Sequence, residues 1–404
     1  MSCAIVGQSG GPTAAINATL AGVIKGAANA HQIGKIDTLF GMKNGIEGLL
    51  KEDLISLNEY FFDDKALSYL SDTPGAALGS CRLKLPADKT EAIYDQIFAI
   101  LQKYDIHYFF YIGGNDSMDT TAKLSQISKE RGYPLYVIGV PKTIDNDLCG
   151  TDHTPGFGSA AKFISTVISE IMCDTAVYTK PAVTIVEIMG RDAGWLTASA
   201  ALCADRAPDL IYLPEVPFSI PQFLEDVKAA LKCRSDVVVA VSEGIRLQDG
   251  SYVGASTSSG VKDAFGHQYL GGAGKALEML VKEEIGCKVR SVEINLPQRC
   301  AAHLASATDI SESFAIGCAA VDYAIRQITG HMMVFIRKPS SQYEIEIGSL
   351  PVSEIANQVK AVPRHFINEK GNYPTPECIA YLTPLIQGER YITFVGGVPS
   401  FFRF

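Results

Sequence analysis

Residues 135–147 read LYVIGVPKTIDND, a continuous apolar run that passes directly into a dense polar segment. An uninterrupted apolar run is typical of a strand in a parallel sheet, because helices cover both faces of such a sheet and neither face meets water. In parallel sheets, ligands bind just beyond the carboxyl ends of the strands. The stretch therefore predicts an α/β fold and puts residues 141–147 at a binding edge.

The same pattern recurs along the chain. Four further apolar runs each end at a turn that contains glycine, and helical segments follow most of them. These runs are residues 4–6, 107–112, 182–188 and 236–241. Strands that alternate with helices predict mostly parallel sheets, so we expect the functional residues just after these runs.

The composition indicates a compact protein and argues against nucleic-acid binding. The chain has 404 residues, of which 47% are hydrophobic and 20% charged, and this length suits two or three domains. The formal net charge is −9, and no basic stripe of the kind that binds nucleic acid is visible. An anionic substrate would therefore be held by a few local cations and by backbone N–H groups.

Neither a signal peptide nor a membrane span is visible in the sequence. The N-terminus enters a strand directly, and no apolar run reaches the roughly 18 residues that a membrane helix needs. The ten cysteines are scattered, without the spacing of a zinc site, which is typical of buried free thiols in a reducing compartment. We expect a cytoplasmic protein that binds no membrane.

Two glycine-rich loops, GQSGGP at residues 7–12 and GGNDS at residues 113–117, each join a strand to a helix. Glycine lets the backbone approach an anion, and the helix N-terminus favours one. Gly114 and Ser117 are candidate contacts to a phosphoryl donor, whereas simple turns and an N-cap are the plain alternatives. The first loop also fits the nucleophile elbow of hydrolases, but only one strand precedes it, which argues against that site.

The segment after the apolar run at 135–140 carries the densest chemistry. In an extended stretch, Thr143, Asp145 and Asp147 point to one face. Two carboxylates at this spacing suit a general base and a partner that orients the base or holds a metal. A polar surface turn is the alternative, although such turns usually carry fewer of these groups.

The next two apolar runs end at residues 189–191 and at Glu243. Arg191 could neutralise charge that spreads over a transferring phosphoryl group, or it could pair with Asp192 or Asp205. Glu243 could bind sugar hydroxyls, or it could be an exposed loop residue.

Arg290 and Arg299 lie on either side of a short apolar segment. The planar guanidinium group binds two phosphate oxygens at once, which makes arginine a favoured ligand for sugar phosphates. A solvated arginine is the ordinary alternative for each of them.

In chain order, the motifs GGNDS, PKTIDND, GTDHTPGFGSA, MGRDAGWL, SEG and RSVEINLPQR closely resemble the phosphofructokinase family. The resemblance runs from Gly7 to about Asp309, and the TIDND and MGR segments in that order are highly specific. It implies two Rossmann-like, doubly wound α/β domains with mostly parallel sheets, an active site in the cleft between them, and a C-terminal extension.

The resemblance also implies a division of the chain. Residues 1–150 would bind the phosphoryl donor, and residues 151–342 would bind the sugar phosphate, with the chain crossing back to the first domain after about residue 295. Prolines interrupt the sequence beyond Tyr343, so residues 343–404 are expected to form the extension.

Individual roles follow from the same resemblance. Asp145 matches the general base that takes the proton from the C1 hydroxyl of fructose 6-phosphate, with Thr143 and Asp147 in support. Arg191 matches a stabiliser of the transition state. The other matches are donor contacts at Gly11 and Arg82, sugar contacts at Met189, Gly190 and Glu243, and contacts to the 6-phosphate at Arg290 and Arg299.

Two positions bear on the donor. ATP-using members have Gly where Asp116 and Lys142 stand, whereas pyrophosphate-using members resemble this chain at both positions. An aspartate would fill the place of a nucleotide's α-phosphate, and a lysine would compensate for a small, highly charged donor. The resemblance thus implies reversible transfer from pyrophosphate to fructose 6-phosphate in glycolysis. An ATP-dependent enzyme is the alternative, and a non-catalytic regulatory subunit is a further one that the presence of Asp145 disfavours.

The family resemblance further implies Mg²⁺ and a homodimer or homotetramer, because its sites form between domains and often between subunits. Three positions depart from the family pattern. Asn115 stands where an Asp usually helps to hold Mg²⁺. Asp116 or water is therefore expected to act as a ligand as well. Leu296 replaces a His or Tyr that touches the sugar phosphate, and Ala182 replaces an Arg from a neighbouring subunit, a role that Lys180 could take.

Overall fold

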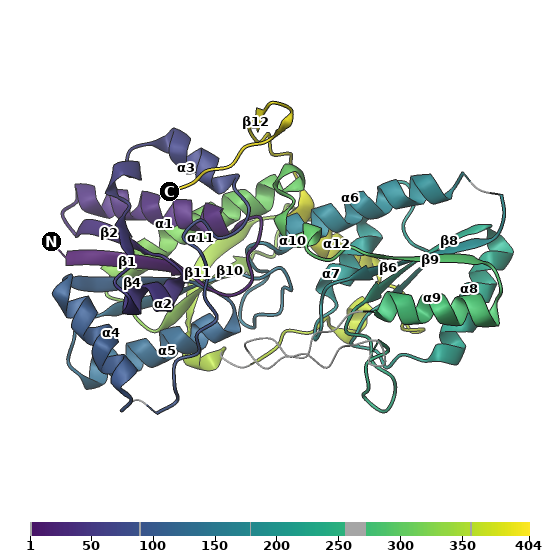
Figure 1. The fold of residues 1–404 in the computed structure, drawn as a ribbon, viewed down its shortest axis with the longest axis horizontal. Coiled ribbons are helices and arrows are strands. Elements are labelled where there is room, and N and C mark those ends of the chain that lie inside the picture. Colours follow the sequence, from purple (N-terminus) through teal and green to yellow (C-terminus); the bar gives the residue numbers. More distant parts are fainter. Residues whose placement is uncertain (1, 89, 178, 255–271, 356–357) are drawn as a thin grey trace.

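The computed structural model describes residues 2–88, 90–177, 179–254, 272–355 and 358–404. Two α/β lobes lie side by side along the longest axis of the molecule (Figure 1). The larger lobe is built on a seven-stranded sheet and the smaller lobe on a four-stranded sheet.

The larger sheet has the strand order β11-β10-β5-β4-β1-β2-β3. Its central strands are parallel, whereas β3 and β11 join the two edges as antiparallel strands. In chain order the strands are β1 (Ser2–Gln8), β2 (Ile36–Met42), β3 (Leu54–Ser56), β4 (Ile106–Gly113), β5 (Tyr136–Pro141), β10 (His331–Arg337) and β11 (Ile345–Pro351).

Helices cover both faces of this sheet, which explains why its central strands are mostly apolar. Within β1, Ala4 and Val6 pack into the core on one face and Ile5 into the core on the other. The first face carries α1 (Ile16–Gln32), α3 (Asp64–Ser71) and α11 (Ala307–Ile325), and the second carries α2 (Gly45–Leu50), α4 (Ala92–Lys103) and α5 (Asn115–Glu130).

Helices α1 and α11 approach each other closely at two glycines. A Cβ on Gly22 would lie 2.0 Å from the carbonyl oxygen of Phe314, and a Cβ on Gly317 would lie 2.2 Å from that of Thr19. Larger residues at these positions would push the helices apart. This contact joins the first helix of the chain to one that comes almost 300 residues later, so the larger lobe is built from both ends of the sequence.

The smaller sheet has the order β7-β8-β6-β9, and all its neighbouring strands are parallel. Its strands are β6 (Ala182–Ile188), β7 (Leu210–Tyr212), β8 (Asp236–Ser242) and β9 (Lys288–Glu293). The surrounding helices are α6 (Phe157–Thr175), α7 (Trp195–Ala198), α8 (Ile220–Cys233), α9 (Ala273–Glu284), α10 (Pro297–Cys300) and α12 (Pro376–Leu382). The two mostly parallel, helix-covered sheets confirm the predicted fold class.

The expected C-terminal extension, residues 343–404, begins with a strand of the larger sheet. Strand β11, which begins two residues after Tyr343, pairs with β10 along its whole length and forms an edge of that sheet. Residue 342 therefore lies between two neighbouring strands of one sheet.

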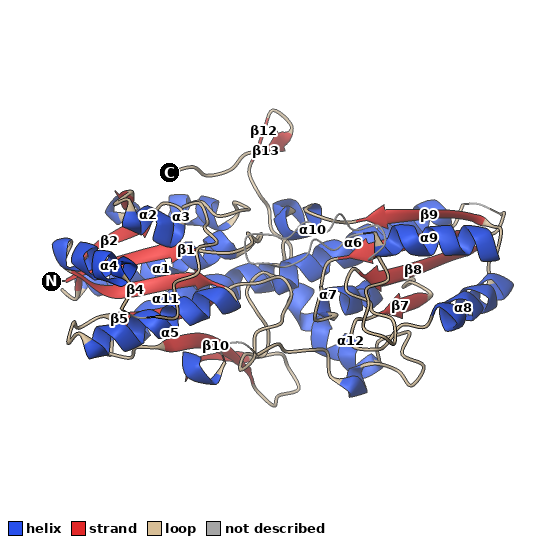
Figure 2. Ribbon diagram, turned by 60° about the horizontal axis from the view of Figure 1, so that its bottom comes forward, coloured by secondary structure: helices blue, strands red, loops and turns tan. Residues whose placement is uncertain are grey.

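Beyond β11 the chain contacts both lobes. Helix α12 packs into the core beneath the smaller sheet, and the final residues return to the larger lobe, where the rings of Phe402 and Phe404 both lie 5.5 Å from that of Tyr60. The small hairpin of β12 (Phe394–Val395) and β13 (Val398–Pro399) stands away from the body (Figure 2). Among the described residues, no helix combines the length and apolar character needed to cross a lipid bilayer.

Candidate active site

The polar segments that follow β1, β4 and β5 meet at one edge of the larger sheet. Lys142 joins the three: its backbone N–H donates to the carbonyl of Gly113 at 2.9 Å, and its Nζ donates to the carbonyl of Gly11. A Cβ on Gly10 would lie 3.4 Å from Lys142 Nζ, and Gly10 itself has a positive φ of 77°. The first glycine-rich loop therefore wraps around the end of this lysine.

The side chain of Lys142 is 3% exposed. Burial lowers its pKa to about 8, opposed by the negative charge of Asp145 and reinforced by the positive charges of Arg299 and Arg82. Both arginines and the Asp145 carboxylate therefore lie close enough to the amine for their charges to act on it. The result is a concentration of positive charge beside a backbone loop, which suits a small polyanion.

Arg299, at the end of α10, lies on the donor side of this region. A Cβ on Gly11 would lie 3.4 Å from Arg299 Nη1. Arg290 is elsewhere: it sits on β9 opposite Thr184, with Nη1 3.9 Å from Asp174 Oδ2. Arg290 and Arg299 therefore lie apart within one chain. Arg290 is within β9 opposite Thr184, and not beyond the carboxyl ends of the strands where the site lies.

The second glycine-rich loop begins α5. Gly114 is the N-cap residue, and Ser117 is buried so close to Gly113 that a Cβ there would lie 1.9 Å from Ser117 Oγ. Asp116 pairs with Lys84, with 2.8 Å between Oδ1 and Nζ. This arrangement presents backbone N–H groups and a fixed carboxylate at the start of a helix.

The residues expected to hold Mg²⁺ fit a site that phosphate oxygens would complete. Asn115 Oδ1 is buried and accepts no hydrogen bond within the described part of the chain, and the Asp116 carboxylate is adjacent. Among the described residues, no group of three or more His, Cys, Asp or Glu side chains could hold a metal by itself. Mg²⁺ in phosphoryl-transfer sites typically needs only one or two protein oxygens, with phosphates and water supplying the rest.

The turn after β5 presents the candidate base. Asp145 Oδ2 accepts a hydrogen bond from Thr143 Oγ1 at 3.4 Å, and the Asp145 N–H donates to Thr143 Oγ1 at 3.1 Å. Burial and then the charge of Glu243 raise the pKa of Asp145, while Thr143, Lys142 and Arg191 oppose the shift. Burial and the charge of Asp145 likewise raise the pKa of Asp147. A carboxylate with a raised pKa is a better proton acceptor.

The smaller lobe contributes the segments after β6 and β8. The N–H of Gly190 donates to Glu243 Oε1 at 3.2 Å, and Gly190 adopts a φ of 127° that favours glycine. Burial, together with the charge of Glu187, raises the pKa of Glu243 to about 7 against the Gly190 hydrogen bond. Since Arg191 and Glu243 both act on Asp145, residues of the two lobes face each other across one site.

Several residues at the site carried no signal in the sequence. Lys84 neutralises Asp116, and Gln298 Oε1 accepts from the Met189 N–H at 3.2 Å. Lys360, from the segment after β11, donates to Asn146 at 3.0 Å. Each contact joins residues far apart in the chain, so only the fold reveals it.

The positions that depart from the family pattern lie apart from the carboxylate pair. Ala182 is the first residue of β6, at the opposite end of that strand from Met189. Leu296 is 52% exposed. Neither residue contacts Asp145 through any interaction described above.

Comparison with known proteins agrees with this geometry. The model of the family described as phosphofructokinase matches residues 3–324. Pyrophosphate–fructose 6-phosphate 1-phosphotransferase of Halomonas elongata is 41% identical, over 98% of this chain and 94% of the relative. The enzyme of the same name from Xanthomonas campestris pv. campestris is 42% identical over the same shares.

A solved structure extends the likeness to three dimensions. The crystal structure of pyrophosphate-dependent phosphofructokinase from Nitrosospira multiformis is similar with a TM-score of 0.89 at 38% identity, covering 100% of this chain and 96% of that one. The motif order, the two facing lobes and these matches together show that the chain belongs to the phosphofructokinase family.

Proposed function

We propose that this protein transfers a phosphoryl group from pyrophosphate to the C1 hydroxyl of fructose 6-phosphate, giving fructose 1,6-bisphosphate and phosphate. The observation that carries the proposal is the donor corner, where Lys142 is buried against Gly11 and Asp116 stands at the start of α5, paired with Lys84. The buried amine of Lys142 would stabilise a compact polyanion. A nucleotide would approach the Asp116 carboxylate, which would repel it.

In this proposal Asp145 is the general base. It accepts the C1 hydroxyl proton as the oxygen attacks the nearer phosphorus of pyrophosphate, and the bond to the bridging oxygen breaks. Arg191 and Lys142 stabilise the charge on the transferring group and on the departing phosphate. Thr143 keeps the Asp145 carboxylate oriented through its hydrogen bond, and Asp147 supports the same turn.

Donor binding falls to the larger lobe. Gly11, Gly114 and Ser117 would contact phosphate oxygens from the two glycine-rich loops, and Arg82 would add a charged contact. Asn115 and Asp116 would hold Mg²⁺, which would neutralise negative charge on the phosphates. Residues 1–150 thus form the donor-binding part of the chain in this proposal.

Sugar binding falls to the smaller lobe. Met189, Gly190 and Glu243 would contact the sugar, and Arg299 would bind a phosphate close to Gly11. Arg290 lies outside this cleft, paired with Asp174, so we assign it to the site of a neighbouring copy in a homodimer or homotetramer.

A donor assay tests the proposal. The purified protein is incubated with fructose 6-phosphate and Mg²⁺, together with either pyrophosphate or ATP, and fructose 1,6-bisphosphate is measured. We expect turnover with pyrophosphate, and a comparable reverse rate from fructose 1,6-bisphosphate and phosphate because the reaction lies close to equilibrium. Turnover with ATP alone would assign the chain to the ATP-dependent members, and no turnover with either donor would leave a binding role.

A further inference from the structure

Lys360 lies outside every motif considered so far, yet it reaches the turn that carries the candidate base. Its Nζ donates hydrogen bonds to Asn146 Oδ1 at 3.0 Å, to the carbonyl of Thr151 at 3.2 Å and to that of Asp152 at 2.7 Å. Three oxygen acceptors use all three donors of an ammonium group. The amine is therefore held in a cradle of three oxygen atoms, one from the turn and two from the loop that follows it.

The backbone of Lys360 is bound to the same region. Its N–H donates to the carbonyl of Asp147 at 2.8 Å, and the preceding Val359 forms an antiparallel bridge with Leu148. On the other side, the carbonyl of Lys360 accepts from Trp195 Nε1 at 2.8 Å. Lys360 thus links the turn of the larger lobe to helix α7 of the smaller one.

Asn146 is the residue through which Lys360 can act on the chemistry. It is fully buried, stands between the two carboxylates Asp145 and Asp147, and adopts a φ of 54°, a left-handed conformation that few residues other than glycine and asparagine tolerate. The direction of both carboxylates depends on this conformation. The hydrogen bond from Lys360 holds the buried side chain of Asn146 in place.

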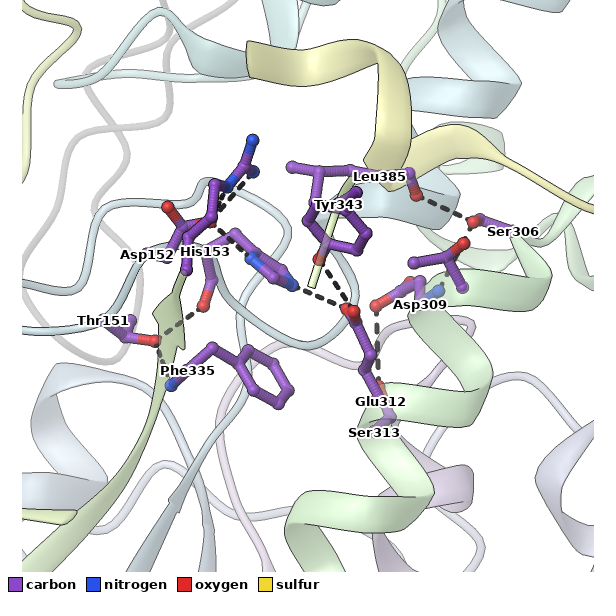
Figure 3. Close-up of polar contacts among 12 residues, drawn as sticks. Thr151, Asp152, His153, Ser306, Asp309, Glu312, Ser313, Phe335, Tyr343 and Leu385 are labelled. Atoms are coloured by element: carbon purple, nitrogen blue, oxygen red, sulfur yellow. Dashed lines mark hydrogen bonds and ion pairs between the residues drawn. The ribbon is translucent and has the colours of Figure 1, made fainter. Parts of the chain in front are cut away.

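The acceptors of Lys360 are themselves held rigidly. Asp152 accepts from Arg337 Nε at 3.2 Å and from its Nη2 at 3.0 Å, and its carbonyl also accepts from Tyr381 Oη at 2.5 Å. His153 lies between Asp152 and Glu312, at 2.8 Å and 2.7 Å respectively (Figure 3). Because Asp152 is bound to several other segments, it holds Lys360 of the C-terminal segment in a fixed position relative to the turn.

The charge of Lys360 also acts on the turn. Burial lowers its pKa to about 8, while the charges of Asp152, Asp147 and Cys149 oppose the shift and that of Arg337 adds to it. At neutral pH the amine is therefore mostly protonated. In return, the charge of Lys360 counteracts the raised pKa of Asp147 that burial and Asp145 produce.

We infer that Lys360 is a positioning residue of the phosphoryl-transfer site, which holds Asn146 and thereby orients the carboxylates of Asp145 and Asp147. The inference rests on the proposed function, because it concerns the same site. It gives the C-terminal segment a role in the reaction, because Lys360 and Val359 of this segment bind the base-carrying turn and the residue that follows it.

The test compares Lys360→Met, which keeps the length of the side chain and removes the ammonium group, with Lys338→Met. Lys338 lies on the same part of the chain and pairs with Glu344 at 2.7 Å on the surface. We expect Lys360→Met to lower kcat by about 10- to 100-fold, as small misplacement of reacting groups does, with KM for the donor nearly unchanged. Lys338→Met should leave both parameters as in the wild type.

The pH profile separates positioning from a merely structural role. Asp145 and Asp147 interact, so they titrate as a pair. Loss of the Lys360 charge should raise the pKa of Asp147 further, so that the pair becomes protonated at higher pH and the acid limb of kcat moves to higher pH. Asn146→Gly tolerates the positive φ of this position. At a pH above the acid limb, where both carboxylates are ionised, Lys360→Met should lower kcat little further in the Asn146→Gly background, because positioning by Lys360 acts through its contact with Asn146.

Lys360→Met with wild-type kcat and an unchanged pH profile, or with an effect that adds fully to that of Asn146→Gly, would overturn the inference even if its melting temperature fell. These outcomes can be distinguished from a failure of the proposed function, because the donor assay on the wild-type protein tests that function separately. If the wild type uses ATP and not pyrophosphate, the donor assignment fails, and the Lys360 comparison is made with ATP.

Discussion

Lys84 and Asp116 form an ion pair at the first turn of α5, with 2.8 Å between Lys84 Nζ and Asp116 Oδ1. The two side chains are 55% and 35% exposed, so the pair contributes little to the free energy of folding. Its effect is on the ligand: it fixes a carboxylate at a helix N-terminus that would otherwise attract a phosphate. Lys142, by contrast, directs its amine to the Gly11 carbonyl.

Removing the Asp116 side chain should open the donor site to a nucleotide. In Asp116→Gly we expect a lower KM for ATP, because both the bulk and the charge at the helix N-terminus are lost, and a slower pyrophosphate reaction, because Lys84 loses its partner. Steady-state kinetics with both donors measure this. Asp116→Asn keeps the size of the side chain and removes its charge. If KM for ATP falls in Asp116→Asn as well as in Asp116→Gly, the charge of Asp116 is what excludes ATP. An unchanged KM for ATP in Asp116→Gly would show that Asp116 excludes nothing.

Lys142 should give the pyrophosphate reaction an alkaline limit. Burial lowers its pKa to about 8, so the amine loses its charge as the pH rises through that value. We expect kcat/KM for pyrophosphate to fall in that range. Lys142→Met should lower the rate by about 10²- to 10³-fold, as loss of one charged contact to a transferring phosphate does, and remove the alkaline limb. An alkaline limb that persists in Lys142→Met belongs to another group.

Asp145 should be indispensable for proton removal. General-base catalysis contributes about 10²- to 10⁴-fold, so Asp145→Asn should slow the forward reaction by at least that factor without unfolding the protein. Asp192→Asn is the control, because Asp192 lies nearby but pairs outward with Arg246 at 2.6 Å. Near-normal activity in a folded Asp145→Asn protein would exclude it as the base.

The acid limb of the rate should respond to Glu243. Because burial and the charge of Glu243 raise the pKa of Asp145, the base becomes protonated at a higher pH than an ordinary aspartate. Glu243→Gln removes the second cause, so the acid limb of kcat/KM for fructose 6-phosphate should move to lower pH even though KM increases. A limb that stays in place would show that Glu243 does not act on the base.

Stability should carry a separate pH dependence from the buried His153. Although burial opposes it, hydrogen bonds to Asp152 and Glu312 raise the pKa of His153. The protonated ring therefore stabilises the fold fully below the unfolded pKa of about 6.5, and this contribution is lost as the pH rises through the higher folded pKa.

Melting temperatures of the wild type and of His153→Gln, measured from about pH 5.5 to about pH 8.5, test this dependence. We expect the gap between the two proteins to be widest at low pH and to narrow as the pH rises. His365→Gln, on a side chain that is 62% exposed, should change little at any pH. A gap that widens with pH contradicts a charged His153.

Much of the fold followed from local sequence patterns. The apolar runs at 4–6, 107–112 and 182–188 lie in the strands β1, β4 and β6, because strands that are covered on both faces are mainly apolar. Local patterns did not supply the partner of each strand. They therefore did not show that the segment at 345–351 pairs with β10 in the larger sheet.

Strand, turn and polar motif are contiguous in the chain, so local spacing predicts which polar groups follow each strand, among them Lys142, Asp145, Arg191 and Glu243. Which of these groups meet depends on the tertiary structure. It separated Arg290 from Arg299, paired Asp116 with Lys84 and brought Lys360 to Asn146, 214 residues away in the chain. The physical reason is that an ion pair or hydrogen bond acts over a few ångströms, and the closing of the chain, which burial of apolar surface drives, sets those distances.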